Sequence, residues 1–257
     1  FLSLTLIKIL FKYFDSPKID LLVNDDTVAI AKTFPCLNQI FTFSYKQKQS
    51  NRWVQEIKFF TSFFRKYDLS INLTSSDRSV LYSLIASRNS ISAVDENPMK
   101  SWWKKMLLSQ YYYFDSTKHI LLNNLEPLNL LNIDHQNRQA TFSSSSESQN
   151  KVKKIIKKNG IKNFIIFHPS AQYEYKIYPR LLREKLLYLL NEIDVPIIIT
   201  GSKNAIDLKI KSEIPTYKNV YNLIGSTSIE EYLALSEMAL AYIGMDTLNM
   251  HIAAMQN

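Results

Sequence analysis

Short apolar runs that end at a polar corner and pass directly into an amphipathic segment restrict the fold of this chain more than any other feature. In the best example, the run Ala239–Gly244 leads to the corner Asp246-Thr247, and apolar residues at helical spacing follow from Leu248. We predict strand, tight turn and helix here, with Asp246 as the N-cap. The free N–H groups of the first helical turn would then point at the corner, which favours a phosphate. A capped helix after a buried strand is also an ordinary element of any α/β protein.

The same alternation extends over the whole chain. Its pattern predicts strands at 19–23, 35–43, 68–73, 163–167, 195–200, 217–224 and 239–244, and helices at 2–14, 24–31, 52–67, 80–85, 147–158, 178–193 and 228–236. The apolar stripe of 52–67 should face a sheet, and Ser228-Ile229-Glu230-Glu231 reads as a capping box. Alternating strands and helices indicate an α/β fold with parallel sheets, whose ligands bind at the carboxyl ends of strands.

A polar stretch over 133–150, with four consecutive serines from Ser143, is the one credible linker. We therefore expect two Rossmann-like domains, at 1–145 and 146–257. Part of the linker, Ala140–Phe142, is compatible with an edge strand.

Charge and cysteine content indicate which partners and which cellular compartment suit the protein. A formal charge of +8 favours an anionic partner, such as nucleic acid, a phosphorylated glycolipid or a membrane surface. Cys36 is the only cysteine, which excludes an internal disulfide and suits a reducing cytoplasm. No apolar run reaches the roughly 20 residues that span a bilayer. The apolar start at 1–11 has no basic residues before it and no cleavage site after it, so an amphipathic helix explains it better than a signal peptide.

Aromatic residues stand beside cations at Trp102–Leu108 and Tyr111–Phe114. Such a mixture suits a membrane interface, stacking on sugars or bases, or an ordinary amphipathic helix against a core. Arg78, after the strand at 68–73, is either a contact to an acceptor phosphate or a solvated residue of a first helical turn.

A second polar corner follows the strand at 163–167. His168-Pro169-Ser170-Ala171 ends that strand, and Lys176-Ile177-Tyr178-Pro179 opens the next helix. Small residues, a cation and a helix N-terminus together can hold a diphosphate leaving group. The alternative for Lys176 is a solvated loop lysine, and His168 reads as a hydrogen-bonding residue at a strand end.

Four segments of the chain resemble the family 9 glycosyltransferases, the bacterial heptosyltransferases of lipopolysaccharide core synthesis. The stretch 246–254 is similar to their signature Asp-Thr-Gly-Pro-Met-His-hydrophobic-Ala-Ala, with Leu248 at the glycine and Asn249 at the frequent proline. The corner at 168–179 is similar to His-Pro-Gly-Ala followed by Lys-x-Trp-Pro. Gly201-Ser202 lies where the family contacts the nucleoside, and 222–231 resembles Asn-Leu-x-Gly-x-Thr-Ser-Leu-x-Glu.

The resemblance implies a GT-B fold, with two Rossmann-like domains facing a cleft, and an inverting, metal-independent transfer of heptose from ADP-heptose to the lipopolysaccharide inner core. Lys176, Asp246 and His251 would serve the reaction, and no cofactor is implied. The implied substrate contacts are Ser170, Gly201, Thr227, Thr247, Leu248 and Arg78. Asp207 is a weak candidate for a nucleoside contact and otherwise a surface charge.

The resemblance also implies a location and an incomplete chain. We expect a cytoplasmic enzyme in peripheral contact with the inner membrane, without a nucleic-acid partner. The family's general base is an aspartate in a loop upstream of what resembles the first helix here, so we expect a fragment that lacks both ends. The rival hypotheses are another sugar nucleotide on the same fold, and a non-catalytic paralogue that binds a nucleotide or glycan.

Overall fold

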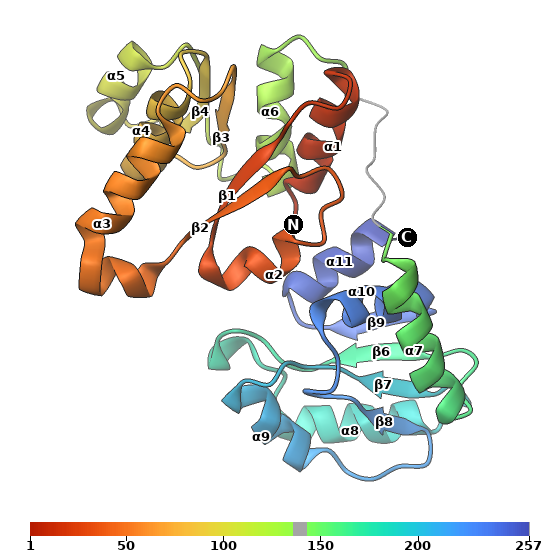
Figure 1. Ribbon diagram of the computed structural model, residues 1–257. Coiled ribbons are helices and arrows are strands. Elements are labelled where there is room, and N and C mark those ends of the chain that lie inside the picture. Colours follow the sequence, from red (N-terminus) through yellow and green to blue (C-terminus); the bar gives the residue numbers. More distant parts are fainter. Residues whose placement is uncertain (136–142, 257) are drawn as a thin grey trace. The chain divides into compact units, whose positions relative to one another are not determined.

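The structure is a computed structural model that describes residues 1–135 and 143–256, except the side chains of 46–52. The chain divides into two compact units, Leu2–Ala140 and Thr141–Asn257, the latter together with Phe1 (Figure 1). We call them the N-terminal and C-terminal units. The strand pairs described in both are parallel, and helices follow the strands. The predicted α/β class with parallel sheets is therefore confirmed.

The C-terminal unit holds a sheet of four parallel strands in the order β8-β7-β6-β9. These strands are β6 (Ile165–His168), β7 (Ile197–Ile199), β8 (Val220–Asn222) and β9 (Ala241–Gly244). The helices are α7 (Ser146–Lys158), α8 (Arg180–Asn191), α9 (Ala205–Glu213), α10 (Ile229–Met238) and α11 (Leu248–Gln256).

Apolar burial and helix caps explain this unit locally. The three isoleucines of β7 are fully buried, as expected for a strand covered on both faces. The predicted capping box is confirmed, because Ser228 accepts from the N–H of Glu231 and the Glu231 carboxylate accepts from the N–H of Ser228. Gly160, just after α7, has a φ of +67°, a backbone conformation that favours glycine at a helix end.

The N-terminal unit holds two separate parallel sheets, β1-β2 and β3-β4-β5. The strands are β1 (Asp20–Asn24), β2 (Gln39–Phe43), β3 (Ser70–Asn72), β4 (Ser90–Val94) and β5 (Gln110–Tyr113). The helices are α1 (Leu4–Tyr13), α2 (Val28–Ala31), α3 (Tyr45–Phe63), α4 (Asp77–Ala86), α5 (Pro98–Leu107) and α6 (Ile120–Leu130). A short 3₁₀ turn at Asp25–Thr27 precedes α2.

The predicted orientation of the apolar stripe at 52–67 is largely wrong. Phe59 and Phe63 pack against β2 and α4, whereas the other large apolar side chains of α3 are exposed. These exposed residues are Trp53, Val54, Ile57 and Phe60, with Phe64 just after the helix. Apolar residues line both sides of this helix, so periodicity alone did not identify the face that packs.

The sequence pattern did not predict two strands of the N-terminal unit, β4 and β5. In β4, Ser90 and Ser92 interrupt the apolar run, yet both are buried and hydrogen-bonded. The strand β5 consists of Gln110 and three tyrosines, a composition that also suits a helix surface. The predicted edge strand at Ala140–Phe142 lies outside the described residues.

Candidate functional site

The candidate site of the C-terminal unit lies at the carboxyl edge of its sheet. The strand order β8-β7-β6-β9 places β7 and β8 on one side of β6, and β9 on the other. From β6 the chain continues to β7 on one side of the sheet, whereas β9 pairs with β6 on the other side. The carboxyl edge between β6 and β9 is therefore a topological switch point. In such sheets ligands bind outside the carboxyl ends of the two strands at the switch. Here those ends carry His168-Pro169-Ser170 and Gly244-Met245-Asp246, the two corners singled out by sequence.

Lys176 and Asp246 come together at this switch point. Lys176 Nζ lies 3.7 Å from Asp246 Oδ2, and both side chains are substantially exposed, at 41% and 68%. An exposed ion pair of this length contributes little to stability, at most about 1 kcal/mol. The ammonium group is therefore available to an anionic ligand.

The helix after this corner begins one residue later than predicted. The carbonyl of Thr247 accepts from the N–H groups of Met250 and His251, at 3.2 and 3.5 Å, and α11 starts at Leu248. Thr247 thus takes the N-cap position that we predicted for Asp246. Asp246 precedes the cap by one residue, and its carboxylate lies toward Lys176.

Ser170 is held by a carboxylate whose importance the sequence did not reveal. The Ser170 hydroxyl donates to Oδ1 of Asp207, and the N–H of Ser202 donates to Oδ2 of the same group at 2.5 Å. Asp207 is only 3% exposed and lies in the first turn of α9, where the helix dipole favours a negative charge. Asp207 therefore joins the loop after β6 to the loop after β7, and it is not the surface charge considered above.

The hydroxyl proton of Ser170 is used in this bond. In that state the side chain has no proton left for a phosphate, so a contact to a diphosphate would come from its backbone N–H. The side chain turns toward Asp207 at a position where the family signature has glycine.

His168 is the hydrogen-bonding strand end that the sequence predicted. It is buried, and its Nδ1 lies 3.1 Å from Thr200 Oγ1 and 2.9 Å from Asn249 Nδ2. When the Asn249 amide N–H donates in this contact, Nδ1 accepts and the ring proton is on Nε2. Asn249, at the family's frequent proline, thus ties the first turn of α11 to the end of β6. Burial lowers the pKa of His168 below its usual value, against an opposing effect of Asp207.

We expect acid to destabilise the C-terminal unit through His168. Its pKa is lowered in the folded state, so below about pH 6.5 the unfolded chain binds a proton that the folded chain does not. The free energy of unfolding should fall with pH in that window and be constant for this group above it. Urea titrations between about pH 5 and pH 7.5 measure the slope, which for one proton approaches about 1.4 kcal/mol per pH unit. In H168Q this contribution should vanish, and equal slopes in both proteins would contradict the assignment.

The remaining predicted residues lie along the same edge of the sheet. Gly201 follows β7, and a Cβ there would approach Ile224 Cγ2 to 3.1 Å and Asp207 Oδ2 to 3.2 Å, so a larger residue would require these side chains to shift by a few tenths of an ångström. Thr227 is half-buried before α10, after the edge strand β8. Leu248, 38% exposed, and His251, half-buried, belong to the start of α11. Six of the predicted residues thus lie around the switch point, namely Ser170, Lys176, Asp246, Thr247, Leu248 and His251. Gly201 and Thr227 lie one and two strands away.

Arg78 belongs to the N-terminal unit and has partners of its own. Its Nε lies 3.4 Å from Glu56 Oε1, and its guanidinium stacks over Phe43, with 4.8 Å from Cζ to the ring centroid. Arg78 is therefore neither fully solvated nor free of a counter-charge.

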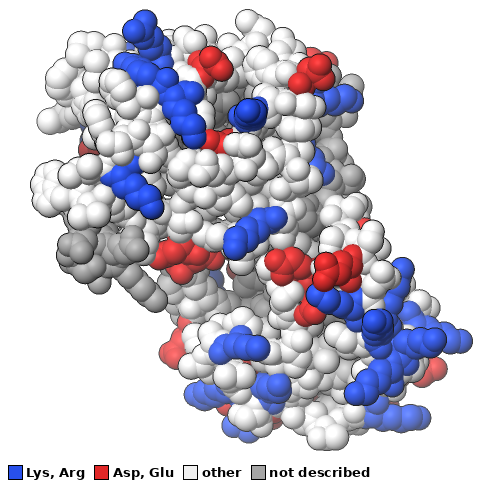
Figure 2. All heavy atoms as spheres, viewed as in Figure 1, with Lys and Arg blue, Asp and Glu red and all other residues white. Residues whose placement is uncertain are grey.

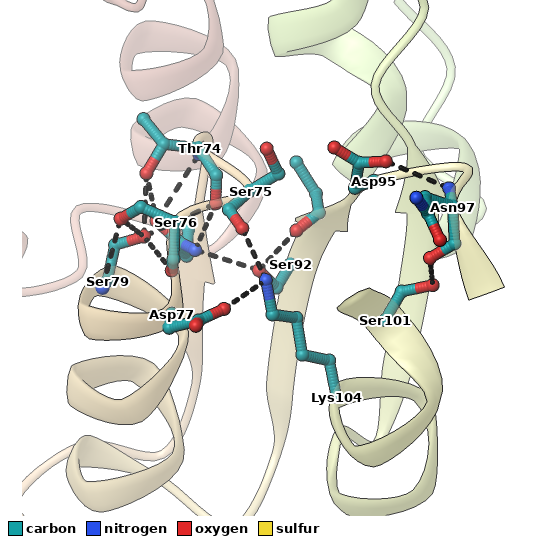
Figure 3. Close-up of polar contacts among 12 residues, drawn as sticks. Thr74, Ser75, Ser76, Asp77, Ser79, Ser92, Asp95, Asn97, Ser101 and Lys104 are labelled. Carbon is teal, nitrogen blue, oxygen red and sulfur yellow. Dashed lines mark hydrogen bonds and ion pairs between the residues drawn. The ribbon is translucent and has the colours of Figure 1, made fainter. Parts of the chain in front are cut away.

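A dense polar network lies close to Arg78, at the carboxyl ends of β3 and β4 (Figure 3). Lys104 of α5 is almost fully buried, and its Nζ contacts the Asp77 carboxylate and the Ser75 carbonyl, each at 2.6 Å. Asn72 donates to Ser92 Oγ at 2.8 Å. Lys104 thus fixes the loop that leads into α4, a role that the sequence did not indicate.

Within the described residues, no group of three or more His, Cys, Asp or Glu side chains is arranged to hold a metal ion. The same part of the chain contains no helix with the length and apolar character needed to cross a bilayer.

Two Rossmann-like units with parallel sheets define the GT-B class, and solved structures agree. The glycosyltransferase family 9 protein of Veillonella parvula DSM 2008 has a TM-score of 0.79 at 14% identity, over 99% of this chain and 74% of that one. The ADP-heptose lipopolysaccharide heptosyltransferase II of Escherichia coli has a TM-score of 0.75 at 16% identity, over 100% and 78%.

The sequence comparison is more specific. A family model described as glycosyltransferase family 9 (heptosyltransferase) matches residues 57–257, so the chain belongs to glycosyltransferase family 9. The lipopolysaccharide heptosyltransferase 3 of Escherichia coli is 24% identical over 263 residues, covering 100% of this chain and 77% of that protein. The protein of that name in strain K12 is 26% identical over 260 residues, covering 98% and 75%. The predicted family and enzyme class, a glycosyltransferase, are confirmed.

Proposed function

We propose that the C-terminal unit binds a sugar nucleotide at the switch point between β6 and β9. The observation that carries this proposal is the meeting of Lys176, Asp246 and the start of α11 at one corner. A cation and the first N–H groups of a helix both favour a diphosphate. Gly201 and Thr227, at the ends of β7 and β8, then lie on the side where a nucleoside would extend.

The donor that we propose is ADP-heptose, used with inversion at the anomeric carbon. The acceptor hydroxyl attacks that carbon as ADP leaves, through a cationic transition state. Lys176 and the N-terminus of α11 would stabilise the negative charge that grows on the leaving diphosphate. Asp246 and His251 would position the phosphates and the sugar.

The acceptor that we propose is the inner core of lipopolysaccharide or lipooligosaccharide, approached from the cytoplasmic face of the inner membrane. Family membership and the two heptosyltransferase 3 relatives support heptose transfer to this kind of acceptor. Excess positive charge suits a phosphorylated glycan, and cations gather over α7 in the C-terminal unit (Figure 2). Arg78 is our proposed acceptor contact in the N-terminal unit, where a phosphate would compete with Glu56.

A thermal-shift titration with ADP, UDP and GDP tests the proposed donor. A ligand that binds only the folded state raises the melting temperature, by an amount that grows with its concentration. We expect ADP to stabilise the protein more than UDP or GDP. Stabilisation by UDP or GDP instead would indicate a different sugar nucleotide. ADP binding without transfer by the full-length protein would favour the non-catalytic paralogue, and no response to any nucleotide would refute the site.

Peripheral membrane contact would use the outer surface of α5 and β5. Met99, Trp102 and Met106 are 87%, 62% and 69% exposed, and the helix contains no acidic residue. Lys105 donates to the hydroxyl of Tyr113 on β5 at 2.8 Å, which raises the pKa of this lysine and keeps it cationic. Exposed aromatic and thioether side chains beside cations are typical of surfaces that bind an anionic bilayer.

Replacing Trp102 with serine should weaken binding to anionic vesicles by about 10- to 150-fold, because insertion of one large apolar side chain contributes about 1.5–3 kcal/mol. Co-sedimentation with phosphatidylglycerol vesicles measures the change. W53S removes an equally prominent tryptophan from α3 and serves as the matched control. If W53S lowers binding and W102S does not, the membrane surface is on α3 instead.

A further inference from the structure

Two exposed tyrosines stack on each other in the loop that joins β6 to α8. This loop lies at the carboxyl end of β6 (Figure 1). The ring centroids of Tyr173 and Tyr175 are 5.7 Å apart, and the ring planes are inclined by 19°. Tyr173 is 53% exposed and Tyr175 is 80% exposed. The two rings thus shield one face of each other and leave their outer faces open to solvent.

Backbone hydrogen bonds hold this loop in place. The N–H of Lys176 donates to the carbonyl of Tyr173 at 2.9 Å and closes a short 3₁₀ turn, Glu174–Lys176. The N–H of Tyr178 then donates to the carbonyl of Pro169, just after β6, at 3.2 Å. The stacked pair is thus preorganised, which lowers the entropy cost of ordering it around a ligand.

A third tyrosine of the loop differs from this pair. Tyr178 turns inward, where its ring contacts Phe167 of β6 edge-on, with 6.4 Å between the centroids, and packs against the core of the C-terminal unit. Burial of Tyr178 therefore anchors the loop. Tyr173 and Tyr175 keep half or more of their surface in water, so burial of these two contributes much less to folding. Packing of the loop explains Tyr178 and leaves the exposed pair without a structural role.

The pair lies next to the charged residues of the switch point. Tyr175 directly precedes Lys176, whose ammonium is 3.7 Å from the Asp246 carboxylate. Two further apolar side chains are exposed where helices leave this edge of the sheet, Leu181 in the first turn of α8 at 79% and Leu248 at the start of α11 at 38%. The edge thus combines a cation that suits a diphosphate with exposed apolar surface that suits the group joined to it.

The chemistry of the pair fits a pyranose ring. A sugar ring presents a face of C–H groups, which stacks on an aromatic ring, and hydroxyl groups at its edge, which bond to polar groups around that ring. The two tyrosine hydroxyls and the exposed carboxylate of Glu174, which stands between them in the sequence, supply such polar groups. The negative charge of Glu174 also disfavours a phosphate or a nucleic acid at this place. In the proposed function the nucleoside lies elsewhere, toward Gly201 and Thr227.

We propose that Tyr173 and Tyr175 form an aromatic platform that binds a pyranose ring beside the diphosphate site. The ring belongs to the sugar of the donor or to the acceptor glycan, which offer the same C–H face. The proposal rests on the proposed function, because Lys176 places the diphosphate there. It adds a contact that selects for the shape of a sugar, which a cation and a helix N-terminus do not supply.

Affinities and kinetics of the full-length variants Y173A and Y175A test the platform. If the ring belongs to the donor, calorimetry should show ADP-heptose binding weakened about tenfold in each variant and ADP binding unchanged. If the ring belongs to the acceptor, both nucleotides should bind normally and the KM for the acceptor should rise about tenfold, with kcat within about twofold of the parent. Y175F keeps the ring and should retain the parental values in either case.

Y188A is the matched control, because Tyr188 is 56% exposed in the second half of α8, away from the loop. It should bind both nucleotides and the acceptor like the parent. All three alanine variants should melt at the parental temperature, because each replaces an exposed side chain. The proposal would be overturned by equal losses of ADP and ADP-heptose affinity, by parental values in both Y173A and Y175A, or by a Y175F protein as impaired as Y175A.

Failure of the proposed function gives a different result. A parent protein that binds neither ADP nor ADP-heptose would refute the nucleotide site. Binding of lipopolysaccharide core oligosaccharide to the parent and to Y175A would then decide on the platform alone. Weaker binding to Y175A would support the platform, and equal or absent binding to both proteins would overturn it.

Discussion

Replacing Lys176 with alanine should lower kcat for sugar transfer by about 100- to 1000-fold, the usual loss when one preorganised donor to developing charge is removed. The ammonium lies at the switch point, 3.7 Å from Asp246, and is exposed enough to meet a ligand. Its positive charge is most valuable when the diphosphate departs, so kcat should change more than KM. Steady-state kinetics of the full-length protein with ADP-heptose measure both.

The matched control is K185A, which removes the same charge from the exposed surface of α8. It should leave kcat within about twofold, and both variants should unfold at the same temperature as the parent, because surface ion pairs contribute little. Equal losses in K176A and K185A would show that only overall charge matters. Unchanged kcat in K176A would remove this residue from the mechanism.

Replacing Asp207 with alanine should destabilise the C-terminal unit by about 2–4 kcal/mol. The change leaves the buried Ser170 hydroxyl and the more exposed Ser202 N–H without their shared acceptor, and an unsatisfied buried donor costs about 1–3 kcal/mol. Urea unfolding monitored by circular dichroism measures the loss. D207N keeps the shape and one acceptor oxygen, so its loss should be about half as large.

The two variants also separate support of the loop from direct binding. If Asp207 acts by holding the loops after β6 and β7, nucleotide affinity should fall in the order parent, D207N, D207A, in parallel with stability. A D207N protein that loses nucleotide binding at full stability would instead make Asp207 a direct ligand contact.

The C-terminal unit was predictable because its local signals agree. Apolar runs such as Ile197–Ile199 are short and bounded, and the Ser228 capping box marks a helix start that the structure confirms. The corner residues follow from the same logic, since the carboxyl ends of adjacent parallel strands must meet. The partner of Ser170 was not predictable from a local pattern, because Asp207 lies 37 residues away in the sequence.

In the N-terminal unit the local signals conflict. In α3 both sides carry apolar residues, and only tertiary packing selects Phe59 and Phe63. In β4 the buried serines obscure the strand pattern, and their hydroxyls accept hydrogen bonds from Asn72 of β3 and from the N–H of Ser109 before β5. In the sequence, Lys104 resembles an ordinary surface lysine, although its ammonium is buried against Asp77. Burial of a charge depends on a partner far along the chain, which no short pattern reveals.

Two residues that differ from the family signature each contact a side chain elsewhere in the C-terminal unit. Asn249 contacts His168 where the family often has proline, and Ser170 donates to Asp207 where the family has glycine. Restoring glycine at 170 would leave Asp207 Oδ1 without its donor, and proline at 249 would remove one of the two contacts of His168 Nδ1, so each reversion is expected to destabilise the C-terminal unit. Positions 170 and 207, and positions 249 and 168, are thus energetically coupled, so that the effect of a substitution at one depends on the residue at the other.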